Sequence, residues 1–241
     1  MMSNYFEPAA GFRIYPICGW HGVFHLLHDL ERKEAILIDA GLVGEMGRLA
    51  AILARIKLGW RDIRAIVLTH GHLDHVGNLA QIKELSGAPI FAHPAEQAHI
   101  DGKYPYRGAA RVCGAMEAVG RAVLRYRAVP IDEPLAPGAE LPFWGGLEVS
   151  HLPGHTEGHC GFYSRRFNLL FSGDLFACYW MSTHLPPFFL NSCPDRLPAS
   201  VRRVMKLSPR YLVPNHYDRP DYEMHRSKFD ALARRVTGTS P

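Results

Sequence analysis

The sequence predicts a single α/β domain, because short apolar runs alternate with amphipathic segments along most of its length. The chain has 241 residues, of which 47% are hydrophobic and 11% aromatic, enough to bury one sizeable core. The sequence shows no internal repeat, low-complexity tract or obvious linker. We therefore expect residues 1–241 to form one domain.

The first half of the chain alternates predicted strands and helices. Apolar and β-branched runs predict strands over the following ranges: 12–18, 22–29, 35–41, 63–70 and 88–93. Amphipathic spacing predicts a helix over 43–56 and another over 76–87, where Gly87 ends the helix. Each strand in this half is thus followed by a loop or a helix, as in an α/β sheet.

The second half begins with a mostly helical excursion over 101–129, which we expect to cover part of the molecule. Short strands separated by turn residues follow, at 147–155, 160–164 and 168–174. The sequence then predicts a helix, a strand and a closing helix, at 195–207, 211–216 and 221–236.

Composition limits the classes of partner. The formal charge is +4 and the basic residues are scattered, so we expect no nucleic-acid partner. No apolar run is long enough to span a membrane and the start lacks a signal-peptide pattern, so we expect no membrane partner and a cytoplasmic location. Five widely spaced cysteines without a C-x-x-C pair favour reduced thiols.

The stretch LTHGHLDHVGN, at 68–78, contains three histidines and an aspartate within six positions at the end of a predicted strand. Imidazole and carboxylate groups are the preferred ligands of zinc and iron. His70 and His72 are two residues apart and point the same way in an extended segment, whereas Asp74 and His75 follow in the turn. Four donors exceed the share of one ion, which indicates a neighbouring second site.

Further ligands are available where other predicted strands end. His155 lies between glycines in PGHTEGH, Asp174 directly follows a strand in FSGD, and His216 ends the strand of VPNHY. Ligands of α/β proteins collect at strand ends because the strand fixes a loop whose side chains stay accessible. These three residues complete a candidate set of seven.

The remaining histidines carry weaker signals. His159, the second histidine of GHTEGH, is expected to stabilise its loop rather than bind metal. His21, His25 and His28 lie in a predicted strand pair without a carboxylate motif, so we expect them in the core or on the surface.

Four motifs in this order resemble the metallo-β-lactamase superfamily: H-x-H-x-D-H at 70–75, G-H-T-x-G-H at 154–159, S-G-D at 172–174 and a late histidine at 216. The resemblance covers essentially the whole chain. It implies a four-layer αβ/βα sandwich, in which two mixed sheets pack face to face with helices on the outer faces. It also implies a site with two metal ions along the edge of the sheets.

The resemblance assigns roles to individual residues. It implies two sets of ligands and one bridging residue: His70, His72 and His155 for one ion, Asp74, His75 and His216 for the other, and Asp174 between them. Asp39 would support the metal loop or cap its own turn. Zinc is the expected metal, with iron or manganese as alternatives.

A site with two such ions predicts that the protein catalyses hydrolysis. Divalent ions about 3.5–4 Å apart share a water, lower its pKa and supply hydroxide at neutral pH. Asp74 and Asp174 are therefore candidate catalytic residues, and Tyr217, which follows His216, is a candidate polar helper. Tyr179 and His184 are weaker candidates for the same role.

We expect the substrate to be a small molecule with an ester, thioester or lactone bond. The apolar segment 176–198 follows Asp174 and, together with a helical lid at 101–129, forms a candidate acyl pocket. A β-lactam-like amide is less expected, because superfamily β-lactamases commonly carry Cys or Ser where Asp174 stands. Glyoxalase II-like thioesterases share the seven ligands, but only 25 residues follow His216, too few for their helical carboxy-terminal domain.

Several alternatives stay open at this stage. A mononuclear iron persulfide dioxygenase of the same superfamily uses part of this ligand set. A phosphodiesterase or nuclease and a non-catalytic metal-binding module are lesser alternatives. The apolar segment 176–198 is also compatible with ordinary core or with a homodimer contact.

Overall fold

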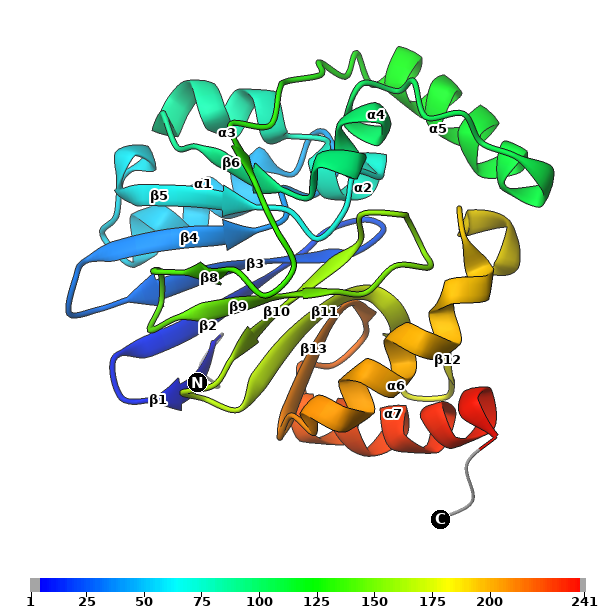
Figure 1. Cartoon of the computed structure of the whole chain (residues 1–241). Coiled ribbons are helices and arrows are strands. Elements are labelled where there is room, and N and C mark those ends of the chain that lie inside the picture. Colours follow the sequence, from blue (N-terminus) through cyan, green and yellow to red (C-terminus); the bar gives the residue numbers. More distant parts are fainter. Residues whose placement is uncertain (1–4, 239–241) are drawn as a thin grey trace.

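The computed structural model describes residues 5–238, which form two β-sheets packed face to face with helices outside (Figure 1). The first sheet has the spatial order β1 (Phe6–Ala9), β2 (Phe12–Cys18), β3 (Val23–Asp29), β4 (Glu34–Ile38), β5 (Ile63–Val67), β6 (Ile90–Ala92) and β7 (Glu133–Pro134). Strands β1 to β4 pair antiparallel and β4 to β7 pair parallel, so this sheet is mixed.

The second sheet is also mixed. Its strands are β8 (Glu140–Leu141), β9 (Leu147–His151), β10 (Cys160–Ser164), β11 (Leu169–Cys178), β12 (Thr183–His184) and β13 (Tyr211–Tyr217). Strand β13 pairs parallel with β11, and the other neighbours pair antiparallel. The helices are α1 (Met46–Arg55), α2 (Leu73–Val76), α3 (Leu79–Ser86), α4 (Gln97–Ile100), α5 (Arg111–Val123), α6 (Leu197–Leu207) and α7 (Tyr222–Thr237).

Alternating side chains build the layers. Along β5, Ala65 and Val67 enter the core between the two sheets, whereas Ile66 faces the outer layer. On the second sheet, Phe171 enters the same central core and Leu170 faces the opposite side. Because both faces of each sheet are covered, these strands are apolar throughout rather than alternating between apolar and polar.

The outer helices cover the remaining apolar faces. Leu49 and Leu53 of α1 and Ile82 of α3 pack on the first sheet. The second sheet is covered by α6 and α7, which contribute Val201 and Phe229. The order helix, sheet, sheet, helix confirms the predicted αβ/βα sandwich.

The predicted elements are present, but several bounds differ. Strand β4 ends at Ile38 rather than 41, because Asp39 has a left-handed φ of 64° that breaks the extended chain. Only Arg111–Val123 of the excursion 101–129 is α-helical. The predicted strand at 168–174 extends to Cys178, and the predicted turn that carries Asp74 and His75 is the one-turn helix α2.

Short strands were missed by sequence reading because they carry too few residues for a period-2 pattern. They are β1, β7, β8 and β12, each of two to four residues. No helix of the described residues is long and apolar enough to cross a bilayer.

Candidate metal centre

The histidine-rich stretch follows β5 and changes from extended to helical conformation. His72 is extended, with φ −68° and ψ 152°, and it precedes α2, which carries Asp74 and His75. A Cβ added at Gly71 would lie 2.7 Å from the Cβ of His99, so only glycine fits between the two histidines. The change of conformation lets one short segment present four ligand groups in different directions.

The three other predicted ligands arrive from the second sheet. His155 lies in the loop after β9, and Asp174 and His216 lie on the neighbouring strands β11 and β13. The register of β11 against β13 shifts around Gly173, whose φ is +53°. Such an irregularity re-aims the following side chain, and here it precedes Asp174.

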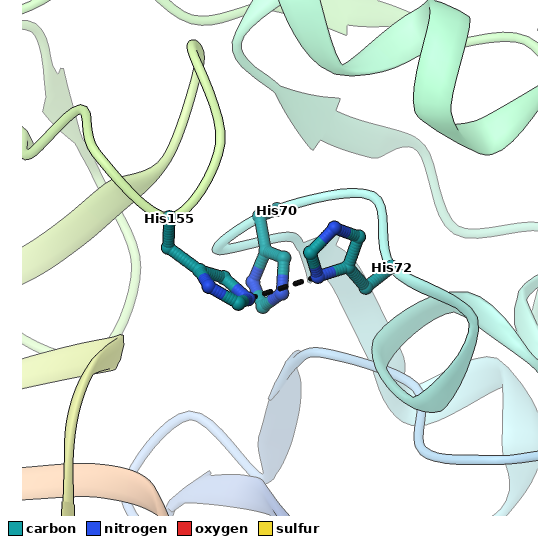
Figure 2. Close-up of side chains that lie close together, drawn as sticks. All are labelled: His70, His72 and His155. Carbon is teal, nitrogen blue, oxygen red and sulfur yellow. Dashed lines mark hydrogen bonds between the residues drawn. The ribbon is translucent and has the colours of Figure 1, made fainter. Parts of the chain in front are cut away.

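His70, His72 and His155 form one group of potential ligands (Figure 2). One ring nitrogen of each lies within 4.8 Å of those of the other two. The closest approach is 2.8 Å, between Nδ1 of His72 and Nε2 of His155. All three imidazoles are buried, and they come from two different sheets.

Asp74, His75 and His216 form a second group, in which one ligand atom of each residue again lies within 4.8 Å of those of the other two. Oδ2 of Asp74 lies 3.6 Å from Nε2 of His75 and 3.6 Å from Nε2 of His216. Asp174 lies between the groups, because its Oδ2 is 3.0 Å from His216 and 3.6 Å from Nε2 of His155. The structure thus brings all seven predicted ligands together.

Three buried atoms of this cluster have no hydrogen-bond partner among the described residues: Nε2 of His70, Nε2 of His75 and Oδ1 of Asp174. A buried polar atom without a partner is costly, so it indicates a missing ligand, ion or water. Imidazole nitrogens and carboxylate oxygens are suited to divalent transition metals. The residues present therefore fit a metal centre.

Protonation differs between the two groups. Burial holds the pKa of His70 and of His72 well below the ordinary value, which leaves neutral imidazoles ready to bind metal. Burial also opposes protonation of His216, but the carboxylates of Asp174 and Asp74 outweigh it and raise its pKa to about 9. The second group therefore carries a proton that a cation has to displace.

Asp39 connects the metal loop to the sheets beneath it. This buried carboxylate accepts hydrogen bonds from the backbone N–H and the hydroxyl of Thr69, at 2.7 and 2.8 Å. It also accepts from Nδ1 of His75 at 3.0 Å and from Nδ2 of Asn215 at 2.6 Å. These bonds fix the ring of His75 so that Nε2 faces the cluster.

Two further carboxylates hold the backbone of the loop, and sequence reading missed both. Glu96 accepts the N–H of Gly71 at 2.7 Å, and Glu117 on α5 accepts the N–H of Leu73 at 2.7 Å. Glu96 also accepts from Thr156 and Gly158 of the His155 loop. Neither glutamate lies in a recognisable motif, and only the fold brings them to the loop.

The cluster lies on a cavity of about 520 Å³. Met116 and Leu124 of the α5 segment line it, and Phe176, Pro187 and Leu190 line it from the chain after Asp174. The wall is mainly apolar around the metal ligands, as in many small-molecule sites. Segments of the predicted lid and of the predicted pocket therefore both reach this cavity.

Of the other candidate residues, some line the cavity and one does not. Tyr217 does not line the cavity, because its side chain enters the core between the sheets and its hydroxyl lies 3.2 Å from Nε2 of His25. Tyr179 and His184 do line the cavity. His21 lines it too, which the sequence did not predict because no carboxylate motif accompanies this histidine.

His159 supports Asp174 instead of joining a ligand group. Its Nδ1 donates to the carbonyl of Leu152 at 3.0 Å, and its Nε2 accepts the backbone N–H of Asp174 at 3.0 Å. Asn191 has a similar part, since its Oδ1 lies 3.0 Å from Nδ1 of His155. Both residues orient ligands through hydrogen bonds.

Fold and site together define a metal-binding αβ/βα sandwich, and comparisons with known proteins place it in a family. The sequence profile of the metallo-β-lactamase superfamily matches residues 26–216. The chain therefore belongs to the metallo-β-lactamase superfamily.

Relatives of known sequence include metallo-hydrolases. "Probable metallo-hydrolase YybB" of Bacillus subtilis is 33% identical over 153 residues, which span 64% of this chain and 62% of that relative. "Hydroxyacylglutathione hydrolase GloC" of Haemophilus influenzae is 30% identical over 169 residues, 67% of this chain and 70% of the relative.

Solved structures share the fold. The metallo-β-lactamase family protein TTHA1429 of Thermus thermophilus superimposes with a TM-score of 0.75 at 22% identity, covering 96% of this chain and 81% of that one. TTHA1623, solved in a di-iron-bound form, gives a TM-score of 0.62 at 31% identity, covering 84% and 91%.

Proposed function

We propose that this protein is a metal-dependent hydrolase that cleaves a small-molecule ester, thioester or lactone at a site for two divalent cations. The observation that carries the proposal is the convergence of seven potential ligand groups in one cluster, five of which line the same cavity. The metallo-hydrolases and the hydroxyacylglutathione hydrolase among the relatives support the reaction class.

In this proposal His70, His72 and His155 hold one cation and Asp74, His75 and His216 hold the other. Asp174 contacts both sets through its carboxylate. Cations bound there supply Lewis acidity and a water of lowered pKa. We propose zinc, with iron or manganese as alternatives, and the di-iron form of TTHA1623 supports keeping iron among them.

The chain's own groups then orient the reactants. The side chain of Asp74 is 27% exposed and its Oδ2 lies between two imidazoles, so it can accept a proton from a water at the cavity surface. Tyr179 lies on the same wall, and burial raises the pKa of its phenol, which keeps it a hydrogen-bond donor. His184 stands beside it, with ring centroids 6.2 Å apart.

The cavity wall favours an uncharged acyl substrate. No lysine or arginine is among the described residues that line it, and the carboxylate of Glu117 on this wall is already paired with Arg121. A glutathione thioester carries two carboxylates and would lack a cationic partner there. We therefore propose a neutral ester, thioester or lactone in preference to a glutathione conjugate.

A substrate panel tests this choice. Metal-loaded protein is assayed with an uncharged acyl thioester, a lactone and an acylglutathione, and Asp174→Asn serves as the matched inactive control. We expect kcat/KM to be at least about tenfold higher for an uncharged substrate, a difference of about 1.4 kcal/mol in transition-state binding. Preference for the acylglutathione would overturn the assignment.

The variant Asp174→Asn also tests whether the two-cation site is needed for turnover. Asp174→Asn removes the charge that faces both ligand groups, so we expect turnover to fall by more than about a hundredfold, beyond what loss of a supporting residue costs. The variant should stay folded, which circular dichroism checks, because Asp174 lies on the cavity rather than in the apolar core. Full activity in the variant would exclude the two-cation site.

A further inference from the structure

Most exposed apolar side chains lie on the segments that line the metal cavity. Nine large hydrophobic residues are exposed among residues 5–238. Eight of them lie on segments that also line the cavity: Trp20, Val112, Met116, Val119, Val123, Trp180, Met181 and Phe188. The ninth, Leu85, lies on α3. Scattered single exposures need no explanation, but this concentration at one opening does.

One side of the mouth is a stripe along α5. Val112, Met116, Val119 and Val123 are spaced by four, three and four residues, so they share one face of the helix. Their side chains are 52% to 73% exposed. The cavity-facing side of the helix is different, because Cys113 is buried there. Met116 belongs to the stripe and also lines the cavity, so the stripe continues into the cavity wall.

The other side comes from the chain between β11 and α6. Phe188 and Met181 are 72% and 87% exposed, and each is close in sequence to a cavity-lining residue. The 3₁₀ turn that contains Phe188 (Phe188–Leu190) packs against α5. Figure 1 shows α5 and the chain leading into α6 at the same end of the molecule. These side chains and the α5 stripe lie on segments that line the same cavity, and we call them together the apolar mouth.

Exposed arginines flank the α5 stripe in the sequence. Arg111 stands directly before the α5 stripe and Arg125 stands two residues after it, and Arg107 precedes the helix. All three are exposed, and none forms an ion pair with a carboxylate of the described chain. Glu117, the acidic residue of α5, is already paired with Arg121.

The opposite side of the apolar mouth is cationic as well. The guanidinium of Arg219 lies 4.1 Å from the ring centroid of Trp180, and Nζ of Lys228 lies 5.7 Å from it. Asp218 is the carboxylate nearby, and it accepts the backbone N–H of Trp180. Cations thus stand on both sides of the exposed apolar side chains.

We propose that the apolar mouth docks on an anionic lipid surface. Apolar side chains flanked by arginine and lysine are typical of segments that lie in a membrane interface. A second copy of the chain fits less well, because a symmetric contact through this face brings the same arginines of two copies together. This inference differs from the sequence-based expectation of no membrane partner, and it does not depend on the proposed hydrolysis.

Co-sedimentation with vesicles tests the proposal directly. The whole metal-loaded protein is mixed with vesicles of phosphatidylcholine alone or of equal parts phosphatidylcholine and phosphatidylglycerol. We expect binding to the mixed vesicles, at least about tenfold tighter than to the neutral ones, because several cations approach the surface. Added sodium chloride should weaken this binding by screening the charges.

Paired variants separate the two contributions. Val119→Ser with Val123→Ser should weaken binding by about tenfold through lost apolar burial, and Arg111→Gln with Arg125→Gln by about fivefold for each charge. Leu85→Ser and Arg61→Gln are the matched controls, because they lie away from the apolar mouth. Serine and valine have similar helix propensities, so circular dichroism should show an intact fold.

Three results would overturn the proposal. The first is a protein that sediments with neither kind of vesicle. The second is binding that the valine and arginine variants leave unchanged. The third is a dimer by light scattering that Val119→Ser with Val123→Ser dissociates, which would make the apolar mouth an interface between two copies.

Discussion

At the scale of single residues, Asp39 determines how the metal loop is held. Its two oxygens accept four hydrogen bonds, from Thr69 and His75 of the metal loop and from Asn215 on β13. Asparagine at this position would replace one acceptor by a donor and remove the charge that stabilises the N–H of His75. The loop would then lose its support without losing a ligand.

We predict that Asp39→Asn weakens metal binding by about 10–100-fold, the usual cost of losing a residue that orients a ligand. A competition titration with a chromophoric chelator measures the affinity. Asp62→Asn is the control, because Asp62 accepts the N–H of Gly59 at the other end of β5. Equal affinities of Asp39→Asn and the control would show that Asp39 has no part in holding the loop.

His25 makes the stability of the folded protein depend on pH. It is fully buried on β3, and burial, with a smaller effect of His225, lowers its pKa to about 3. The unfolded chain, with a pKa near the ordinary value of 6.5, binds this proton more readily than the folded one. The stability that His25 contributes is therefore present above pH 6.5 and is lost as the pH falls below it.

We predict that His25→Gln flattens the acid side of the stability profile. Between about pH 6 and 4.5, the free energy of unfolding of the wild type should fall by up to about 1.4 kcal/mol per pH unit more than that of the variant. Urea unfolding of chelator-treated proteins measures both profiles without a contribution from metal release. Parallel profiles would contradict the assignment of a neutral buried His25.

At the scale of elements, α5 and the metal loop are coupled through Glu117. Its Oε1 accepts the N–H of Leu73, and its Oε2 accepts from Arg121 at 3.1 Å and from Tyr106 at 3.3 Å. Arg121 in turn donates to the carbonyl of Gly71 at 3.3 Å. One helix thus contacts the backbone on both sides of His72.

We predict that Glu117→Ala destabilises the protein by about 1–3 kcal/mol, because it leaves the N–H of Leu73 without a partner and removes the carboxylate that pairs with Arg121. Hydrogen exchange of the Leu73 amide should accelerate in the variant. Glu223→Ala is the control, since Glu223 pairs with Arg210 at an exposed site on α7. Unchanged exchange at Leu73 would show that α5 does not hold the loop.

The sequence predicted the long elements because each carries a complete pattern. The runs at β2, β4 and β11 are apolar on both faces, and such runs identify buried strands. Element ends were less predictable, because tertiary contacts decide them. Asp39 adopts its left-handed conformation with its carboxylate bonded to Thr69, and nothing near it in the sequence records that contact.

The sequence indicated the seven residues that the structure clusters, because four lie within six positions and the others follow apolar runs. The residues that orient them were not, since Glu96, Glu117 and Asn191 reach the site from segments far away in sequence. Tyr217 shows that closeness to a ligand in the sequence does not place a side chain in the site. It follows His216 directly, but successive side chains of β13 point to opposite faces, so Tyr217 enters the core.

At the scale of the whole molecule, each of the two sheets supplies part of the ligand cluster. The first sheet supplies the loop after β5, and the second supplies His155, Asp174 and His216. The central core below packs Val67 of one sheet near Phe171 of the other and fixes their relative position. The geometry of the metal centre is therefore a property of the sandwich rather than of any single loop.

The central claim is a site for two cations, and metal content tests it most directly. Elemental analysis of protein purified without added metal should give two zinc, iron or manganese atoms per chain. Removal of both by a chelator should abolish hydrolysis of the uncharged substrate, and added zinc should restore it. One iron per chain with oxygen uptake in place of hydrolysis, or hydrolysis that persists after complete metal removal, would contradict the account.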